Sequence, residues 1–121
     1  MGTFTLTGVT YNNNEEENNN LWVAAGLNGQ ISYSHDLSSW TEYQTPAETT
    51  VQNLSITFGK DSENQNLWLT TRWWDSVGEV STSSDPSSGG AGGWTIIDAG
   101  GLDSGNDAAY GNGVWVAIGK N

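Results

Sequence analysis

The chain has 121 residues, which is enough for one domain and too few for two. Fourteen acidic residues against three basic ones give a net charge of −11, so we expect neither nucleic acid nor an anionic membrane surface as a partner. The chain has no cysteine for a disulfide framework, and no apolar run is long enough to span a membrane.

The first part of the chain predicts four short strands. Residues 3–11 alternate in character and are rich in Thr and aromatic side chains, which is typical of a strand. The polar run 12–20 predicts a solvated loop. The dipeptide Asn28-Gly29 is typical of a tight hairpin turn. Further strands are expected around this turn and after it, over 21–27, 30–34 and 40–44.

The second part of the chain repeats this layout. We expect a strand over 51–58, a polar loop over 59–66, and an enlarged flexible turn over 86–93. No segment shows an apolar period of 3.6 residues over helical length, so we predict ten strands and no helix. The remaining strands are expected over 67–71, 79–83, 94–98, 106–110 and 114–118.

The sequence also repeats residue by residue. Gly29 to Asp36 matches Gly78 to Asp85 without a gap, and Trp22, Trp68 and Trp115 lie 46 and 47 residues apart in matching strands. Repeats of about 40 to 50 residues with four antiparallel strands are typical of propeller blades. A stacked β-helix would need shorter repeats, and an immunoglobulin-like sandwich would not repeat its sequence.

We therefore predict an all-β domain of four-stranded antiparallel β-propeller blades, with about two and a half repeats in one chain. Repeat 1 covers 1–50, repeat 2 covers 51–103, and a half repeat covers 104–121. Such a chain alone would expose blade faces, so we expect a homo-oligomer that closes the ring, with three copies favoured over two. A truncated or engineered fragment is the competing explanation, and it too would have to associate.

The stretch 34–40, Ser-His-Asp-Leu-Ser-Ser-Trp, resembles the Asp-box, or bacterial neuraminidase repeat, of sialidase-type propellers, with its pattern Ser-x-Asp-x-Gly-x-x-Trp. The resemblance implies that Asp36 and Asp85 cap the turn between the third and fourth strands of a blade. It implies that the Trp after the turn opens the outer strand and packs between blades. In this chain the box is one residue short before Trp40 and long before Trp94, and Ser38 stands at the glycine position.

A sialidase-type active site would need three arginines, a Tyr–Glu pair and an Asp acid/base. This chain has one arginine, Arg72, so we expect no enzymatic activity. His35 is the single histidine and no cysteine accompanies it, so a zinc site is not expected. Residues 103–107 carry oxygen ligands at alternate positions but lack the calcium-loop spacing. We expect no metal and no cofactor.

The second repeat has three extra residues between Trp68 and Gly78, in the segment Arg72-Trp73-Trp74-Asp75. We expect this segment to form a hairpin loop. Its indole rings could pack on a neighbouring blade, form a subunit interface or bind a glycan. The other repeated tryptophans and the two turn aspartates are expected to be structural: Trp22, Asp36, Trp40, Trp68, Asp85, Trp94 and Trp115.

Two functions follow from these patterns. The first is a non-enzymatic propeller module with a structural, adhesive or protein-interaction role, similar to propeller proteins of bacteria and phages and placed outside the cell or on a virion. The alternative is an oligomeric carbohydrate-binding lectin that uses pockets between blades and the Arg72–Asp75 loop.

Overall fold

The computed structural model describes residues 5–12, 20–44, 51–74, 77–88, 93–98, 101 and 103–120. Regular structure within these ranges is β-strand and short 3₁₀ turn, which includes η1 (Pro86–Ser88). The prediction of ten strands and no α-helix is confirmed for these residues. In chain order the strands are β1 (Leu6–Tyr11), β2 (Trp22–Gly26), β3 (Gln30–Ser34), β4 (Thr41–Gln44), β5 (Gln52–Lys60), β6 (Asn66–Trp74), β7 (Val77–Ser83), β8 (Thr95–Asp98), β9 (Ser104–Gly111) and β10 (Val114–Lys120).

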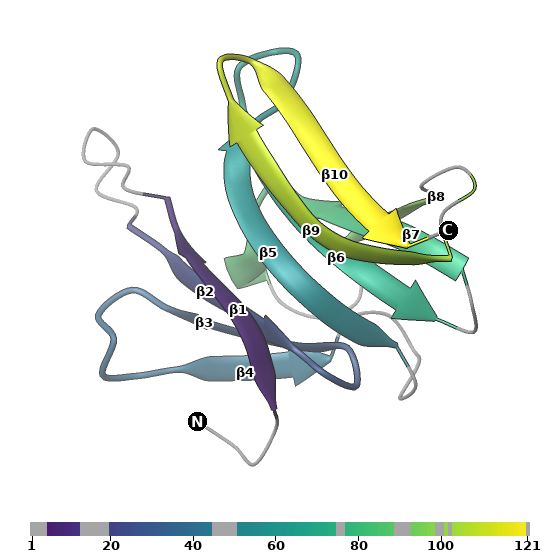
Figure 1. Cartoon of the computed structure of the whole chain (residues 1–121). Coiled ribbons are helices and arrows are strands. Elements are labelled where there is room, and N and C mark those ends of the chain that lie inside the picture. Colours follow the sequence, from purple (N-terminus) through teal and green to yellow (C-terminus); the bar gives the residue numbers. More distant parts are fainter. Residues whose placement is uncertain are drawn as a thin grey trace.

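The strands form three antiparallel units that follow the order of the chain. β1 to β4 make the first sheet, β5 to β8 make the second sheet, and β9 with β10 makes the third hairpin. Figure 1 shows that the first strands of the three units, β1, β5 and β9, run beside one another. Both full repeats of the sequence therefore fold as four-stranded antiparallel sheets.

The three units share one register between their first and second strands. Tyr11 pairs with Trp22, Phe58 with Trp68, and Tyr110 with Trp115. The first strand of each unit also carries a one-residue β-bulge at the same distance from this pair, and such a bulge bends and twists a strand. The bulged residues are Thr7, Leu54 and Asn106. The pairing therefore defines equivalent positions in all three units.

Alternation along each strand gives every unit two faces. The face of the first sheet that bears Leu21, Val23 and Ala25 packs on the face of the second sheet that bears Ile56 and Trp68, and together they form the hydrophobic core. We call the side equivalent to Leu21 the forward face of a unit and the side equivalent to Trp68 the rear face. The forward face of each unit thus meets the rear face of the next.

Hydrogen bonds join the units along these faces. Thr7 Oγ1 donates to Asn53 O at 2.7 Å, and Thr57 Oγ1 donates to Ala108 O at 2.7 Å. Tyr43, on the forward face of the first sheet, accepts a hydrogen bond from Trp94 Nε1 at 2.8 Å. Burial raises the pKa of Tyr43 to about 12, and the hydrogen bond from Trp94 acts in the opposite direction.

The structure corrects one expectation about the second sheet. Arg72, Trp73 and Trp74 do not form a loop but extend β6, where they pair with Glu79, Gly78 and Val77 of β7. Tryptophan favours extended backbone, so the extra residues lengthen both strands of this hairpin. Asp75, the last residue of the predicted loop, lies outside the described residues.

Candidate functional site

Asp36 organises the turn between β3 and β4. Its Oδ1 accepts the backbone N–H groups of Ser38 and Ser39, both at 2.8 Å, and Ser34 Oγ accepts the N–H of Leu37 at 2.8 Å. The hydrogen bonds from Ser39 and Ser38 hold the pKa of the Asp36 carboxyl below its usual value. Asp36 therefore caps this turn in its charged form.

The left-handed residue of this turn is Leu37, with φ of 65°. Ser38, which stands at the glycine position of the resembled pattern in sequence, has no positive φ. The left-handed conformation of this turn is thus at Leu37. A side chain with a Cβ is strained in this conformation.

Asp85 has a similar place before β8. Its Oδ1 accepts the N–H of Ser87 at 3.0 Å, and its own N–H donates to Ser83 Oγ at 3.2 Å. In the first repeat the N–H of Asp36 donates to Ser34 Oγ at the same distance of 3.2 Å. The two aspartates thus keep one local network of hydrogen bonds, although the second turn continues into η1.

Arg72 and Trp73 point to opposite faces of the second sheet. Arg72 is 1% exposed and shares the rear face with Trp68, whereas Trp73 is 42% exposed and belongs to the forward face. They therefore do not form one binding site. The pairing given above places Trp74 at the end of β6.

The remaining candidate residues are His35, which lies in a turn, and 103–107, which lie mostly along a strand. His35 is exposed in its turn, with Nδ1 2.8 Å from the carbonyl oxygen of Asn20. Residues 104–107 belong to β9 rather than to a loop. In the part of the chain that the structure describes, no group of three or more His, Asp or Glu side chains could hold a metal ion. No helix among the described residues has the length and apolar character needed to cross a membrane.

An aromatic pair recurs on the rear face of every unit. The ring centroids lie 4.5 Å apart in Tyr11–Trp22, 4.9 Å apart in Phe58–Trp68, and 4.9 Å apart in Tyr110–Trp115. The second pair contacts the forward face of the first sheet, since Trp68 is part of the core and Phe58 packs against it. The third pair lies against the forward face of the second sheet, where Trp115 Nε1 donates to Lys60 O at 2.7 Å.

Gly59 makes room for the third pair. A Cβ atom at Gly59 would lie 2.6 Å from Cζ2 of Trp115 and would also overlap the ring of Tyr110. Glycine is therefore required where the two rings press on the strand backbone.

The rear face of the first sheet is open. Val9 is 59% exposed there, whereas its equivalent in the second sheet, Ile56, is 7% exposed in the core. A shallow hollow on this face is lined by apolar side chains and glycine: Leu6, Gly8, Val9, Ala24 and Trp40. The aromatic pair of the first sheet, Tyr11–Trp22, is half-buried on the same face.

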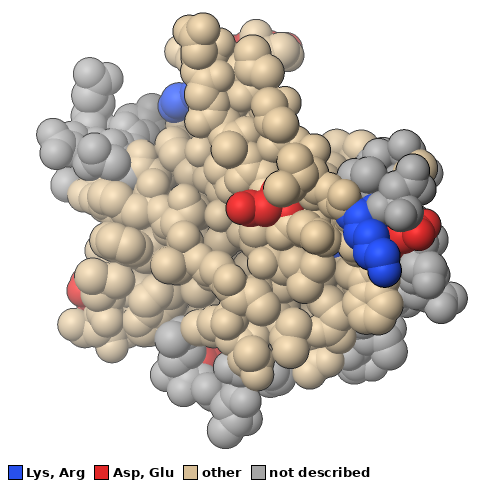
Figure 2. Space-filling model, in the orientation of Figure 1, with Lys and Arg blue, Asp and Glu red and all other residues tan. Residues whose placement is uncertain are grey.

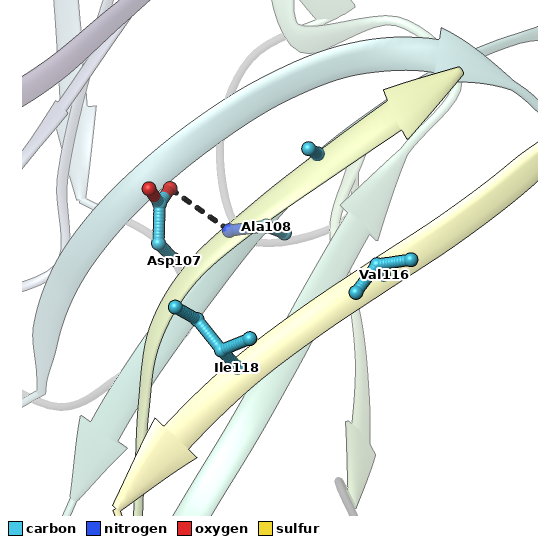
Figure 3. A pocket seen from close by; sticks show the side chains of 5 residues that line it. Asp107, Ala108, Val116 and Ile118 are labelled. Atoms are coloured by element: carbon cyan, nitrogen blue, oxygen red, sulfur yellow. Dashed lines mark hydrogen bonds between the residues drawn. The ribbon is translucent and has the colours of Figure 1, made fainter.

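The forward face of the third hairpin is also open. Val114, Val116 and Ile118 are 57%, 56% and 59% exposed. Their equivalents in the first sheet, Leu21, Val23 and Ala25, are at most 1% exposed. Figure 3 shows Val116 and Ile118 on β10 beside Asp107 and Ala108 of β9, around a shallow hollow whose lining is mostly apolar.

Charged side chains are sparse on the side of the molecule that carries the third hairpin, and most of its surface in Figure 2 is uncharged. Exposed apolar patches on soluble proteins usually mark interaction sites. The candidate site of this chain is therefore a pair of open faces, one at each end of the stack of units.

Comparison of the chain with protein-family models, with curated proteins and with solved structures gives no match. The sequence led us to expect exposed blade faces, but it did not identify Val9, Val114, Val116 and Ile118 as the residues on them. A signal for them was present, because Val114, Val116 and Ile118 align with the buried Leu21, Val23 and Ala25 when the repeated tryptophans are matched.

Proposed function

We propose that this chain is a non-enzymatic β-propeller module that builds a ring with further copies of itself and has a structural, adhesive or protein-interaction role. The observation that carries the proposal is the exposure of Val114, Val116 and Ile118 at positions that are buried in the first sheet. Burial of one such side chain contributes about 1.5 to 3 kcal/mol, so covering the face would stabilise an assembly.

The packing of the units supports the propeller geometry. Each unit meets the next through the same two faces, and the first strands lie beside one another. Repetition of one contact between equivalent units generates a rotational or helical array. A ring of blades is the arrangement of four-stranded antiparallel units that closes such an array.

The packing of the third hairpin helps to decide how many copies of the chain would close a ring. It packs on the second sheet as the second sheet packs on the first, which supports giving it a blade position of its own in the proposed ring. Two copies would supply six positions and three copies would supply nine, whereas propellers usually have about four to eight blades. We therefore propose two copies in place of the three that the sequence favoured.

Sedimentation velocity and light scattering over a dilution series test this proposal. We expect a species of twice the chain mass at high concentration, with reversible dissociation on dilution. A chain that stays monomeric and cooperatively folded at every concentration would contradict self-assembly, and a stable trimer would contradict the two-copy ring.

Carbohydrate binding is a second candidate, and the exposed indole of Trp73 favours it because sugars stack on aromatic faces. A glycan array with the native chain and with Trp73→Ala and Trp73→Phe variants would test it. Binding that the Phe variant keeps and the Ala variant loses would support a lectin. Absence of binding by the native chain would leave the structural role.

A further inference from the structure

We infer that two copies join head to tail, with the Tyr11–Trp22 pair of one copy seated on Gly111 of the other. The inference rests on the proposed self-assembly and adds the two faces and the residues that make the contact. The rear face of the first sheet is one partner surface, and the forward face of the third hairpin is the other.

The contact between the second sheet and the third hairpin provides the template. There an aromatic pair on a rear face, Tyr110–Trp115, sits on a glycine of the preceding forward face, Gly59. Gly59 directly follows Phe58 of its own aromatic pair. The socket is thus a glycine placed one residue after the aromatic residue of a first strand.

Gly111 has this same position in the third hairpin, because it directly follows Tyr110. The two glycines differ in their surroundings. Gly59 is buried under two rings, whereas Gly111 is exposed and a Cβ atom there would meet no atom within 4 Å. The third hairpin therefore carries an empty copy of the socket that Gly59 provides.

Tyr11–Trp22 is the aromatic pair whose rear face meets no other unit among the described residues, whereas Phe58–Trp68 packs against the first sheet, where Asn12 stands at the position of the glycine. The ring centroids of Tyr11–Trp22 are 4.5 Å apart, close to the 4.9 Å of the pair seated on Gly59. The uncovered aromatic pair Tyr11–Trp22 lies in the first unit of the chain, and the uncovered glycine Gly111 lies in the last unit. Two copies can satisfy both through the contact that the chain already makes internally.

The side chains around the pair and the socket also match the internal contacts. Val9 takes the place of Ile56, which is 7% exposed in the core, and Trp40 takes the place of Trp94, which is 5% exposed. Val116 on the opposing face takes the place of the fully buried Val23. An apolar strip thus borders the rings on one face and the glycine on the other.

This contact joins two different surfaces, so each copy can use both of them. Such a heterologous contact closes a ring when its rotation matches the number of units. A contact between two identical faces would instead leave the other face of each copy open.

Mixing two variants distinguishes these arrangements. Val9→Arg adds a charge to the rear face and Val116→Arg adds one to the forward face, and both sites are exposed in the single chain. Ile96→Arg, at an exposed strand position outside both faces of contact, adds the same charge and is the control. The masses are measured by light scattering, each variant alone and the two mixed in equal amounts.

We expect the Ile96→Arg variant to assemble as the native chain does and each of the other variants to remain monomeric. The equimolar mixture should form a 1:1 complex, because the intact forward face of one variant meets the intact rear face of the other. A native chain that is itself monomeric would overturn both the proposed function and this inference.

If the native chain forms an oligomer but the variants do not behave as expected, the head-to-tail contact alone would be overturned. Such behaviour would be self-association of either arginine variant by itself, or no complex in the mixture. Gly111→Val adds a second readout, since it fills the socket and a Cβ atom there would meet no atom within 4 Å in the single chain. We expect it to weaken assembly at least tenfold and to leave the folded monomer unchanged by circular dichroism.

Discussion

Asp36 is the residue on which the first turn depends. Its carboxylate accepts two backbone N–H groups, so replacing it with Ala removes both acceptors. We expect Asp36→Ala to lower the free energy of unfolding at neutral pH, as the loss of a cap does. Urea denaturation measures this change, and Ser39→Ala, which keeps the backbone donor, is the control. An unchanged midpoint for Asp36→Ala would contradict the capping role.

The effect of this substitution should depend on pH in a defined direction. The pKa of Asp36 is lowered in the folded chain, so the charged carboxylate stabilises the fold above its ordinary pKa of 3.8. That contribution is lost as the pH falls through the lower folded value. The difference in stability between the native chain and Asp36→Ala should therefore shrink below about pH 4.

Leu37 gives a prediction of the opposite sign. Its φ of 65° strains a side chain with a Cβ by about 1 to 2 kcal/mol, whereas glycine adopts this conformation freely. We expect Leu37→Gly to raise the free energy of unfolding by about 0.5 to 1 kcal/mol, since glycine also loses more entropy on folding. Ser38→Gly is the matched control, because Ser38 has no positive φ. Equal effects of the two changes would contradict the assignment of the turn.

At the scale of single elements, Gly59 determines how the third hairpin lies on the second sheet. A Cβ atom at this position would overlap the rings of Tyr110 and Trp115. We expect Gly59→Ala to destabilise the fold by about 1 to 3 kcal/mol, as overpacking does. Thermal unfolding of dilute protein, with Gly111→Ala as the control, checks this. Equal stability of the two variants would show that the hairpin can shift at no cost.

The sequence predicted the strands well where each one is short and bounded by turn residues. Asn28-Gly29 forms the expected turn, with φ of 60° and 70°, and the same dipeptide at Asn112-Gly113 joins β9 to β10 with φ of 51° and 77°. The segment after Trp68 was harder, because three extra residues can form a loop or lengthen two paired strands. The extra residues lengthen the strands because β6 and β7 pair along them. The sequence of one strand does not show which residues of the other strand it pairs with.

The two open faces could not be found from hydrophobic pattern alone. Val23 and Val116 have the same residue type and equivalent strand positions, yet one is fully buried and the other is 56% exposed. The difference arises from what lies opposite each strand, which is a property of the packed units. The sequence did contain the equivalence of the repeats, and this equivalence shows which exposed residues lack a covering surface.

At the scale of the whole molecule, charge opposes the assembly that the apolar faces favour. Each copy carries a net charge of −11, so two copies repel each other. The Debye length falls from about 30 Å at 0.01 M salt to about 3 Å at 1 M salt, so added salt removes most of this repulsion. Added salt has little effect on the contacts made by Val9, Trp22 and Val116, because these side chains carry no charge.

We therefore expect sodium chloride to strengthen self-association, with a dissociation constant about tenfold lower at 0.5 M than at 0.01 M, because screening shortens the range of the repulsion. Sedimentation equilibrium at several salt concentrations measures this constant. Ile96→Arg, which changes the net charge from −11 to −10 outside the contact faces, should associate slightly more tightly than the native chain at low salt and equally at high salt. Association that weakens as salt is added would instead indicate ion pairs between copies, and would contradict an apolar contact between the two faces.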